Sequence, residues 1–387
     1  MFELTEDQQA IVDAVNKVCM AFGDDYWLAR DTDGAFPDAF VADMAAGGWL
    51  GTAMPEAYGG AGLGVTEAAL VMHTVARAGA GFSGASAIHI NLFGPMPLVV
   101  FGTDAQKERH LPPLIAGKER CCFGVTEPNA GLNTTAIETR AERNGDHYII
   151  NGRKMWTSTA QSASKILLLA RTTPLADVRK PTDGISLFYT DMDRSAVDVH
   201  VIDKMGRKAV ASTALFIAGL KVPADDLIGE EGRGFEYLLH GLNPERILIG
   251  AEAVGLGQLS LERAATYARE REVFGRPIGQ NQAIQHPLAA SWAELEAAWL
   301  MCMKAAHLYA AGKPCGAEAN AAKYLSAEAG FTACERSVMT HGGMGYAKEF
   351  HVERYLREVM IARIAPVSRE LILSFLAERV LELPKSY

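Results

Sequence analysis

The chain has 387 residues, of which 49% are hydrophobic and 21% are charged, and its formal net charge is -9. This composition is typical of a soluble globular protein, and the length predicts two or three domains. The acidic balance argues against a nucleic-acid-binding surface, but it leaves room for a local basic pocket for a phosphorylated ligand.

The N-terminus and the cysteines indicate the compartment. Residues 1–7 are acidic, where a signal peptide would be basic and then apolar. We find no run with the length and apolarity needed to cross a bilayer. The six cysteines are scattered, without the spacing of a metal site or a disulfide framework. We therefore expect no signal peptide, no membrane span, and a cytoplasmic or mitochondrial-matrix-like location.

Residues 1–120 are predicted to form an N-terminal helical domain. Apolar residues recur at helical spacing after Thr5, which can cap a helix, and Phe36-Pro37-Asp38 opens a second run that ends at Ala46. The Gly- and Pro-rich residues 54–62 predict a loop. Further helices are expected over 66–78, over 96–101, and from Asp104 to a stop at Leu111-Pro112-Pro113.

Residues 121–230 change to the pattern of a β domain. Short apolar or alternating runs bounded by turn residues predict strands over 165–171, 184–189, 197–202 and 213–222. Asn144-Gly145 and Asn151-Gly152 are hairpin signals on either side of residues 146–150.

Residues 231–387 return to helical periodicity. Long segments over 235–271, 282–311, 317–340 and 368–380, joined by short Gly/Pro breaks, predict an antiparallel helical bundle. The fold class is therefore α+β and mainly α, with a β domain between two helical ones.

The segment 242–246 places a carboxylate, Glu245, at the beginning of a long apolar-periodic run. Glu245 is a candidate general base. The alternative is a helix start, because Asn243 can cap, Pro244 suits the first helical position, and the helix dipole favours an acidic first turn. The dipole would also lower the pKa of Glu245, whereas a general base needs burial to raise it.

Four other segments carry candidate chemistry. Residues 123–135 hold Gly, Pro and hydroxyl groups that suit an anionic or heteroaromatic ligand, or form a plain polar loop. Trp156 is followed by hydroxyls that can meet a planar cofactor, or it is a core strand residue. The corner 271–277 with Gln282 is charged and can be a solvated turn. The glycines of 341–346 permit close backbone approach, or simply a sharp turn.

In this order and spacing, the motifs resemble the acyl-CoA dehydrogenase family over essentially the whole chain. The resemblance rests on Val125-Thr126-Glu127-Pro128, Met155-Trp156-Thr157-Ser158, the corner with Arg271 and Phe274, and Gly342-Gly343-Met344-Gly345-Tyr346. It implies an N-terminal helical domain, a middle β-barrel-like domain and a C-terminal four-helix bundle.

The resemblance also implies non-covalently bound FAD. Phe123, Val125 and Thr126 would lie along one side of the isoalloxazine, Trp156 against the ring, and Ser158 near its reactive edge. Thr157 is also an expected cofactor-binding residue. A neighbouring subunit would complete the adenine and pyrophosphate end through residues that match the family there. These residues are Arg271, Phe274, Gln282, Gly342 and Gly343, so we expect an oligomer, namely a tetramer.

The implied reaction converts an acyl-CoA to a trans-2-enoyl-CoA, with electron-transferring flavoprotein as the oxidant. Many members place the base just before the last helix, but here residues 364–368 contain no carboxylate and Pro366 stands at that position. Isovaleryl-CoA and long-chain enzymes use a position that matches Glu245, which we therefore favour. Asn133, Asn243 and Arg246 are the expected substrate-side residues; Arg246 can equally form an ordinary ion pair.

Two features leave alternatives open. Proline has no N–H, so Pro366 would remove a donor to the thioester oxygen unless a neighbour such as the Val367 amide replaces it. Phe93, Pro95 and Met96 either line the acyl cavity or pack the N-terminal helices.

The fold also suits a flavoprotein oxidase or monooxygenase acting on another substrate, or a non-catalytic scaffold.

Overall fold

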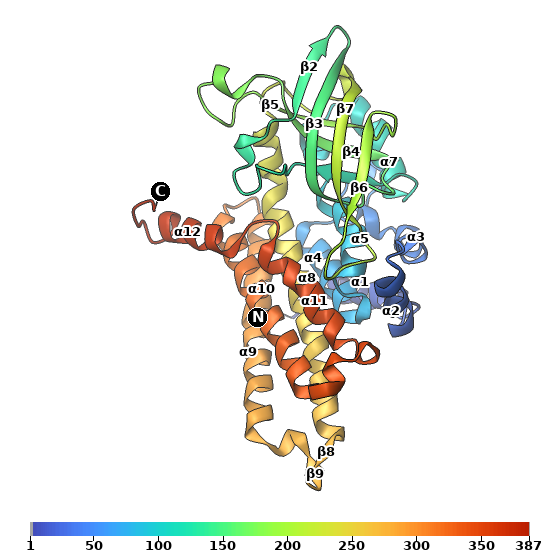
Figure 1. Cartoon of the computed structure of the whole chain (residues 1–387), viewed down its shortest axis with the longest axis vertical. Helices are drawn as coiled ribbons and strands as arrows, with labels where there is room; N and C mark the ends of the chain where they lie inside the picture. The colour runs from blue at the N-terminus through green and yellow to red at the C-terminus, as the bar shows by residue number, and fades with distance from the viewer. Residues whose placement is uncertain (1–2, 387) are drawn as a thin grey trace.

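The computed structural model describes residues 3–386, and Figure 1 shows a β domain above a set of long helices. The N-terminal region is helical, as predicted. Its helices are α1 (Glu6–Cys19), α2 (Asp24–Asp33), α3 (Asp38–Ala46), α4 (Val65–Val75), α5 (Gly81–Phe93), α6 (Met96–Phe101) and α7 (Asp104–Ile115). At the start of α1, the Thr5 side chain accepts from the Gln8 amide, and the Gln8 side chain caps Thr5 in return.

Helix α5 was not predicted, because its glycines and serines hide the helical pattern. It follows a π-helical turn at Ala76–Ala80 in which Gly79 has φ of 102°. The buried Glu358 carboxylate of α11 (Val352–Ile364) accepts from the Ser83 amide at 3.1 Å and from the Ser83 hydroxyl at 2.6 Å. These bonds fix the first turn of α5 against the C-terminal region.

The predicted stop at Pro112-Pro113 is wrong, because α7 continues to Ile115 with both prolines inside it. Each proline removes one helical N–H donor. Glu108 and Arg109, the residues four positions earlier, are exposed, so water can replace the lost donors.

The middle region contains, within the described residues, a seven-stranded sheet with the path β1-β4-β2-β3-β7-β6, and β5 pairs with β4. Only the pairs that β4 makes with β1 and β2 are parallel. The strands are β1 (Cys121–Gly124), β2 (Arg140–Asn144), β3 (His147–Ser158), β4 (Lys165–Arg171), β5 (Ile185–Asp191), β6 (Val197–Ile202) and β7 (Ser212–Pro223).

The hairpin predicted at Asn144-Gly145 is confirmed, since it joins β2 to β3. The one predicted at Asn151-Gly152 is wrong. There β3 continues, and its register with β7 shifts between Ile150 and Gly152. A Cβ atom at Gly152 would lie 2.3 Å from the Thr139 hydroxyl, so the glycine serves a close approach within the sheet rather than a turn.

The C-terminal region is the predicted helical bundle with one further helix, α11. It consists of α8 (Gly234–Glu270), α9 (Gln282–Ala310), α10 (Gly316–His341), α11 and α12 (Arg369–Arg379), with the short strands β8 (Glu272–Val273) and β9 (Arg276–Pro277). In Figure 1, α8 runs from the β domain to the lower tip, where β8 and β9 lie. It packs against α4, α5, α9, α10 and α11.

One described segment, Val65–Phe101, is long and apolar enough to cross a membrane by length and composition, so the sequence-based statement that no run meets this test is wrong. However, 78% of its most apolar window is buried inside the protein. The apolarity of α4 to α6 is therefore that of a core against which α8 packs, as Ala68, Val71 and Ile88 illustrate.

We predict that Gly255→Ala destabilises the protein by about 1–3 kcal/mol, the usual cost of overpacking. A Cβ atom at this position on α8 would lie 2.4 Å from the His73 carbonyl oxygen of α4, so two helix backbones would have to separate. Denaturant unfolding measures the effect. Gly23→Ala is the control, since no atom lies within 4 Å of its Cβ position; equal stability of both variants would contradict the prediction.

Candidate functional site

Glu245 lies in the interior of α8, which corrects the alternative that residues 243–245 begin a helix. The helix begins at Gly234, and Pro244 is inside it. Since Glu245 is three turns from the N-terminus, the helix dipole, which acts within the first turn, does not control its ionisation.

Burial controls the ionisation of Glu245 instead. Glu245 is partly buried, and desolvation raises the pKa of its carboxyl group to about 7, against the lowering effects of His89 and Arg246. No Lys, Arg or His side chain in residues 3–386 lies within ion-pair distance of Glu245. The carboxyl group is thus poised to exchange a proton near neutral pH.

A second carboxylate, Glu252, lies on the same face of α8, seven residues or about two turns further along. Its side chain is 2% exposed and contacts His89 Nδ1 of α5. Burial lowers the pKa of His89, but the Glu252 carboxylate outweighs this and raises it. His89 also feels the charge of Glu245. The pair therefore places a histidine–carboxylate contact beside the candidate base.

Residues 364–368 belong to the same neighbourhood. The buried Lys323 ammonium of α10 donates to the Val367 carbonyl at 2.7 Å, and it lowers the pKa of Glu245. Lys323 thus connects the loop that carries Pro366 to the surroundings of Glu245. The Val367 amide has no hydrogen-bond partner within residues 3–386.

The loop 124–128 is held by a buried ion pair. Lys154 Nζ on β3 donates to the Glu127 carboxylate at 2.8 Å and to the Val125 carbonyl at 3.1 Å. Glu127 also accepts from the Glu138 amide at 2.6 Å. Burial raises the pKa of Glu127, but the Lys154 ammonium and the Glu138 amide outweigh the effect of burial, so the pKa lies below its usual value.

Side chains next to this loop fit the flavin expected from the resemblance. Trp156 is 57% exposed with φ of 61°, so it is not the core residue that a strand tryptophan usually is. The Thr157 hydroxyl is buried and has no partner among residues 3–386. An exposed indole, a half-buried Phe123 ring and an orphaned hydroxyl suit a planar heteroaromatic ligand with hydrogen-bonding edges.

Aromatic contacts connect α5 to this wall. His89 and Phe93 meet edge to face at 4.7 Å between ring centroids, and Phe93 meets Phe123 at 5.8 Å. Phe93 and Pro95 are buried and Met96 is half-buried, and Phe93 belongs to the main core cluster. Of the two sequence alternatives for Phe93, the structure shows the packing of the helices, and the ring also joins His89 to the predicted flavin wall. Its place in an acyl cavity stays a prediction.

Arg207 reaches the same wall from the loop before β7. Its guanidinium donates to the hydroxyls of Ser86 on α5 at 3.1 Å, and of Ser158 on β3 and Ser212 on β7, both at 3.3 Å. Arg207 has φ of 56°, a conformation uncommon outside glycine. Ser158, expected at the reactive edge of the flavin, is thus in contact with a cation.

The predicted substrate-side residues occupy two places. Asn133 is exposed beyond the loop 124–128, and its side chain accepts from the Thr135 hydroxyl at 2.8 Å. Asn243 and Arg246 lie beside Glu245 on α8, where Arg246 donates to the Asn243 side chain at 3.0 Å. Arg246 forms no ion pair with any described residue and its Nε atom is buried without a partner, which argues against the ordinary ion pair.

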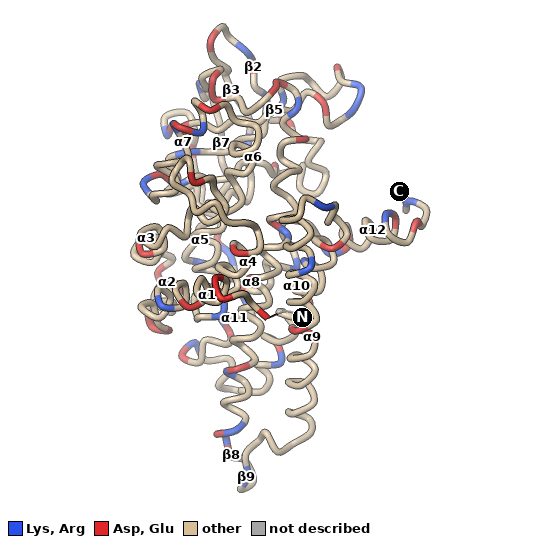
Figure 2. The backbone as a smooth tube through the Cα atoms, turned by 180° about the vertical axis from the view of Figure 1, so that it is seen from behind, with Lys and Arg blue, Asp and Glu red and all other residues tan. Residues whose placement is uncertain are grey.

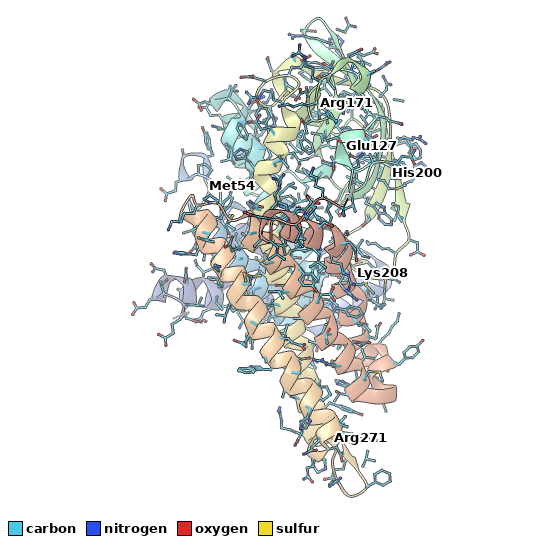
Figure 3. All side chains as sticks on the ribbon, turned by 90° about the vertical axis from the view of Figure 1, so that its left-hand side faces the viewer. Met54, Glu127, Arg171, His200, Lys208 and Arg271 are labelled. Carbon is cyan, nitrogen blue, oxygen red and sulfur yellow. The ribbon has the colours of Figure 1, made fainter. Side chains whose placement is uncertain are left out.

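The residues expected to serve a neighbouring subunit do not join this site. Figure 3 labels Arg271 at the lower tip and Glu127 in the β domain near the opposite end. Phe274 is 100% exposed, and Arg271, Gln282, Gly342 and Gly343 are also exposed. Within one chain these residues are therefore separate from the wall of Trp156.

His89, Glu252 and Arg207 were missed in the sequence. His89 lies on α5, which was not predicted, and Arg207 lies in a loop. For Glu252 a signal existed, because a carboxylate seven residues after Glu245 in an apolar run would lie on the buried face. The buried Lys154–Glu127 pair was not detectable, since its members are 27 residues apart.

Comparisons with known proteins agree with the geometry. Three family models match: the acyl-CoA dehydrogenase N-terminal domain over residues 5–118, the middle domain over 122–219 and the C-terminal domain over 232–381. The chain is 36% identical to acyl-CoA dehydrogenase FadE12 of Mycobacterium tuberculosis, over 99% of this chain and 98% of that protein.

Two further similarities concern other members. The chain is 33% identical to the caffeyl-CoA reductase-Etf complex subunit CarC of Acetobacterium woodii, over 86% of this chain and 87% of that protein. The structure of butyryl-CoA dehydrogenase from Megasphaera elsdenii superposes with a TM-score of 0.93 at 29% identity, covering 98% of this chain and 100% of that one.

We predict that Lys154→Met lowers the free energy of unfolding by about 3–5 kcal/mol, because Glu127 would remain buried and uncompensated. The loop 124–128 would lose its anchor, so the purified variant should also retain less FAD. Thermal unfolding and the flavin content report the two effects. The double variant Lys154→Met/Glu127→Gln should recover part of the stability; a single variant as stable as the parent would contradict the prediction.

Proposed function

Because the chain belongs to the acyl-CoA dehydrogenase family of FAD-dependent oxidoreductases, we propose that it dehydrogenates an acyl-CoA thioester between its α- and β-carbons with Glu245 as the base. The product is the trans-2-enoyl-CoA. The observation that carries the proposal is the partly buried Glu245 carboxyl group, whose pKa is raised to about 7 beside a wall that fits the flavin.

In this mechanism, Glu245 removes the α-proton and keeps it. FAD, when bound, accepts the hydride that leaves the β-carbon. The α-proton and the β-hydride together account for the two electrons and two hydrogens lost when the double bond forms. Phe123 and Trp156 would hold the ring system in place, so that the base and the acceptor address adjacent carbons.

The thioester oxygen needs a hydrogen-bond donor, because removal of the α-proton places negative charge on it. Pro366 has no N–H to offer. The adjacent Val367 amide, free of protein partners in residues 3–386, is the donor that we propose. Lys323 holds the Val367 carbonyl at 2.7 Å and thereby orients this peptide.

Electron-transferring flavoprotein is the proposed oxidant, in line with the Etf complex named for the Acetobacterium woodii relative. A cytoplasmic or matrix-like compartment would supply it. An oxidase or monooxygenase would instead react rapidly with oxygen once reduced, and a scaffold would show no reduction by any acyl-CoA. These observations separate the alternatives.

We further propose that a second copy of the chain completes the FAD site, within a tetramer. Arg271, Phe274 and Gln282 are exposed at the tip of the helices. Helix α9 carries only three Asp, Glu, Lys or Arg residues, and Figure 2 shows it almost without charge. Large apolar side chains are exposed on or near α9 and α10, including Trp292, Leu300, Met339 and Tyr346.

We predict that Glu245→Gln slows anaerobic flavin reduction by the best acyl-CoA at least about 10²-fold, since a general base contributes about that much or more. In the parent protein, the rate should rise with pH through about 7 and then level off, because only the ionised carboxylate accepts a proton. Stopped-flow absorbance with a panel of short, branched, medium and long acyl-CoAs measures the rate loss in the variant and the pH dependence of the parental rate.

The flavin content and the thermal stability of Glu245→Gln serve as controls, and both should stay near the parental values. A variant that reduces its flavin at the parental rate would remove Glu245 from the mechanism. A pH-independent rate in the parent across pH 5.5–8.5, about 1.5 pH units on either side of neutrality, would contradict the proposed ionisation.

We predict that Phe274→Asp lowers both the oligomeric mass and the FAD retained per chain. The aromatic ring is fully exposed at the tip, so a carboxylate there has no effect on the fold of one chain but opposes its burial against a second. Sedimentation measures the oligomeric mass, and flavin absorbance measures the FAD retained per chain. Val201→Asp, at an exposed position of the sheet, is the matched control; a parental mass for Phe274→Asp would refute the interface.

A further inference from the structure

The Arg207 side chain is a half-buried cation without a carboxylate partner. It has five N–H donors, and within residues 3–386 it forms three hydrogen bonds, all to serine hydroxyls, and no ion pair. Buried charges are normally paired or fully hydrogen-bonded. Arg207 therefore has bonding capacity that the protein does not use.

Two buried arginines show what a satisfied guanidinium looks like here. Arg171 donates to four backbone carbonyls, at distances from 2.6 to 3.2 Å. Arg354 meets the Glu358 carboxylate at 3.3 Å and the Gly79 carbonyl at 2.9 Å. Arg207 has neither a carbonyl nor a carboxylate. A hydroxyl is a weaker partner for a cation, and it can turn towards another group.

The nearest acidic groups are already paired. Arg207 feels the charges of Glu252 and Glu358, but Glu252 contacts His89 and Glu358 contacts Arg354. Both carboxylates are therefore engaged by other groups, and Arg207 has no carboxylate of its own within residues 3–386.

The loop is built to hold Arg207 in place. The Lys204 ammonium donates to the Arg207 carbonyl at 2.9 Å and to the Val210 carbonyl at 2.6 Å, which closes the loop on itself. Gly206 lies against α11, where a Cβ atom would be 2.6 Å from the Arg357 carbonyl oxygen. The left-handed φ of Arg207 is maintained by these contacts, and such strain concentrates at binding and active sites.

The three serines locate the guanidinium at the junction of α5, β3 and β7. Ser86 is one turn before His89 on α5, and Ser158 is the residue expected at the reactive edge of the flavin. Figure 3 labels Lys208, the next residue, where the β domain meets the helices. An anion bound by Arg207 would thus lie at the reaction site rather than on the outer surface.

We propose that Arg207 is a specificity residue that binds a carboxylate on the acyl group, so that the preferred substrates are CoA thioesters of dicarboxylic acids. This inference rests on the proposed function and narrows its substrate. A guanidinium binds a carboxylate through two parallel hydrogen bonds, which matches its unused donors. A purely aliphatic acyl chain would instead leave a surplus charge without a partner in the site.

The test compares thioesters matched in carbon number: glutaryl-, adipyl- and pimelyl-CoA against valeryl-, hexanoyl- and heptanoyl-CoA. At least one dicarboxylic thioester should give a higher kcat/KM for flavin reduction than its aliphatic match. Arg207→Gln should lower the ratio of kcat/KM for the dicarboxylic thioester to kcat/KM for its aliphatic match about 10- to 100-fold, the usual effect of losing hydrogen bonds to a charged group. Arg207→Lys, which keeps the charge but not the fork, should fall between.

Binding without turnover gives an independent measurement. Non-reactive S-(ω-carboxyalkyl)-CoA and S-alkyl-CoA thioethers of equal length are titrated calorimetrically into the FAD-loaded protein. The carboxylate should tighten binding to the parent protein and not to Arg207→Gln. Lys208→Gln, which removes the neighbouring charge from a side chain that lines an outer hollow, should keep the parental ratio.

The outcomes separate the two proposals. Preference for the aliphatic thioesters in the parent, or an equal loss for both classes in Arg207→Gln, overturns the carboxylate site and assigns Arg207 to the flavin or the fold. Binding of both thioethers without discrimination also overturns it, while leaving acyl-CoA chemistry intact. If neither thioether binds and no thioester bleaches the flavin, the proposed function fails and the carboxylate site fails with it.

Discussion

The packing of α8 is the constraint on which the rest of the structure depends. At 37 residues it is about 55 Å long, and it contacts helices of both helical regions. Its backbone approaches those neighbours so closely that they leave no room for a side chain at Gly255, or at Gly330 on α10. Such contacts fix the rotation of α8, and the rotation decides that Glu245 and Glu252 share the face turned towards α5.

The interior of this protein shows two kinds of buried charge. Lys154 and Glu127 are paired across 27 residues of the sequence. Arg354 and Glu358 are paired one turn apart on α11, and they bind the Gly79 carbonyl and Ser83 near the start of α5. Desolvation makes an unpaired partner costly, so these pairs hold the loop 124–128 and the start of α5 in single positions. Their contribution is geometric, because they place the groups that face the reaction site.

Glu245 and Arg207 are among the charged groups that have no ion-pair partner within residues 3–386, and neither bonds to a backbone carbonyl through its side chain. A carboxyl group left in this state takes up a proton more readily, which is useful in a base. A guanidinium in this state remains charged and attracts an anion. The same absence of a partner therefore has two chemical consequences, and Arg207 lies beside Ser158, the residue expected at the edge of the flavin.

The sequence by itself determined the elements with strong periodicity and the motifs of the family. Segments 96–101, 165–171 and 197–202 were predicted with the bounds that α6, β4 and β6 have. The signal is local: apolar residues recur three or four positions apart in a helix and two positions apart in a strand. Helix α5 was not found, since it is buried on nearly all sides and glycine and serine interrupt its pattern. Tertiary structure alone decided that Trp156 is exposed, that Glu245 is desolvated beside His89, and that Arg207 lies against Ser158. Burial and charge contact depend on residues far apart in the chain, which no local pattern records.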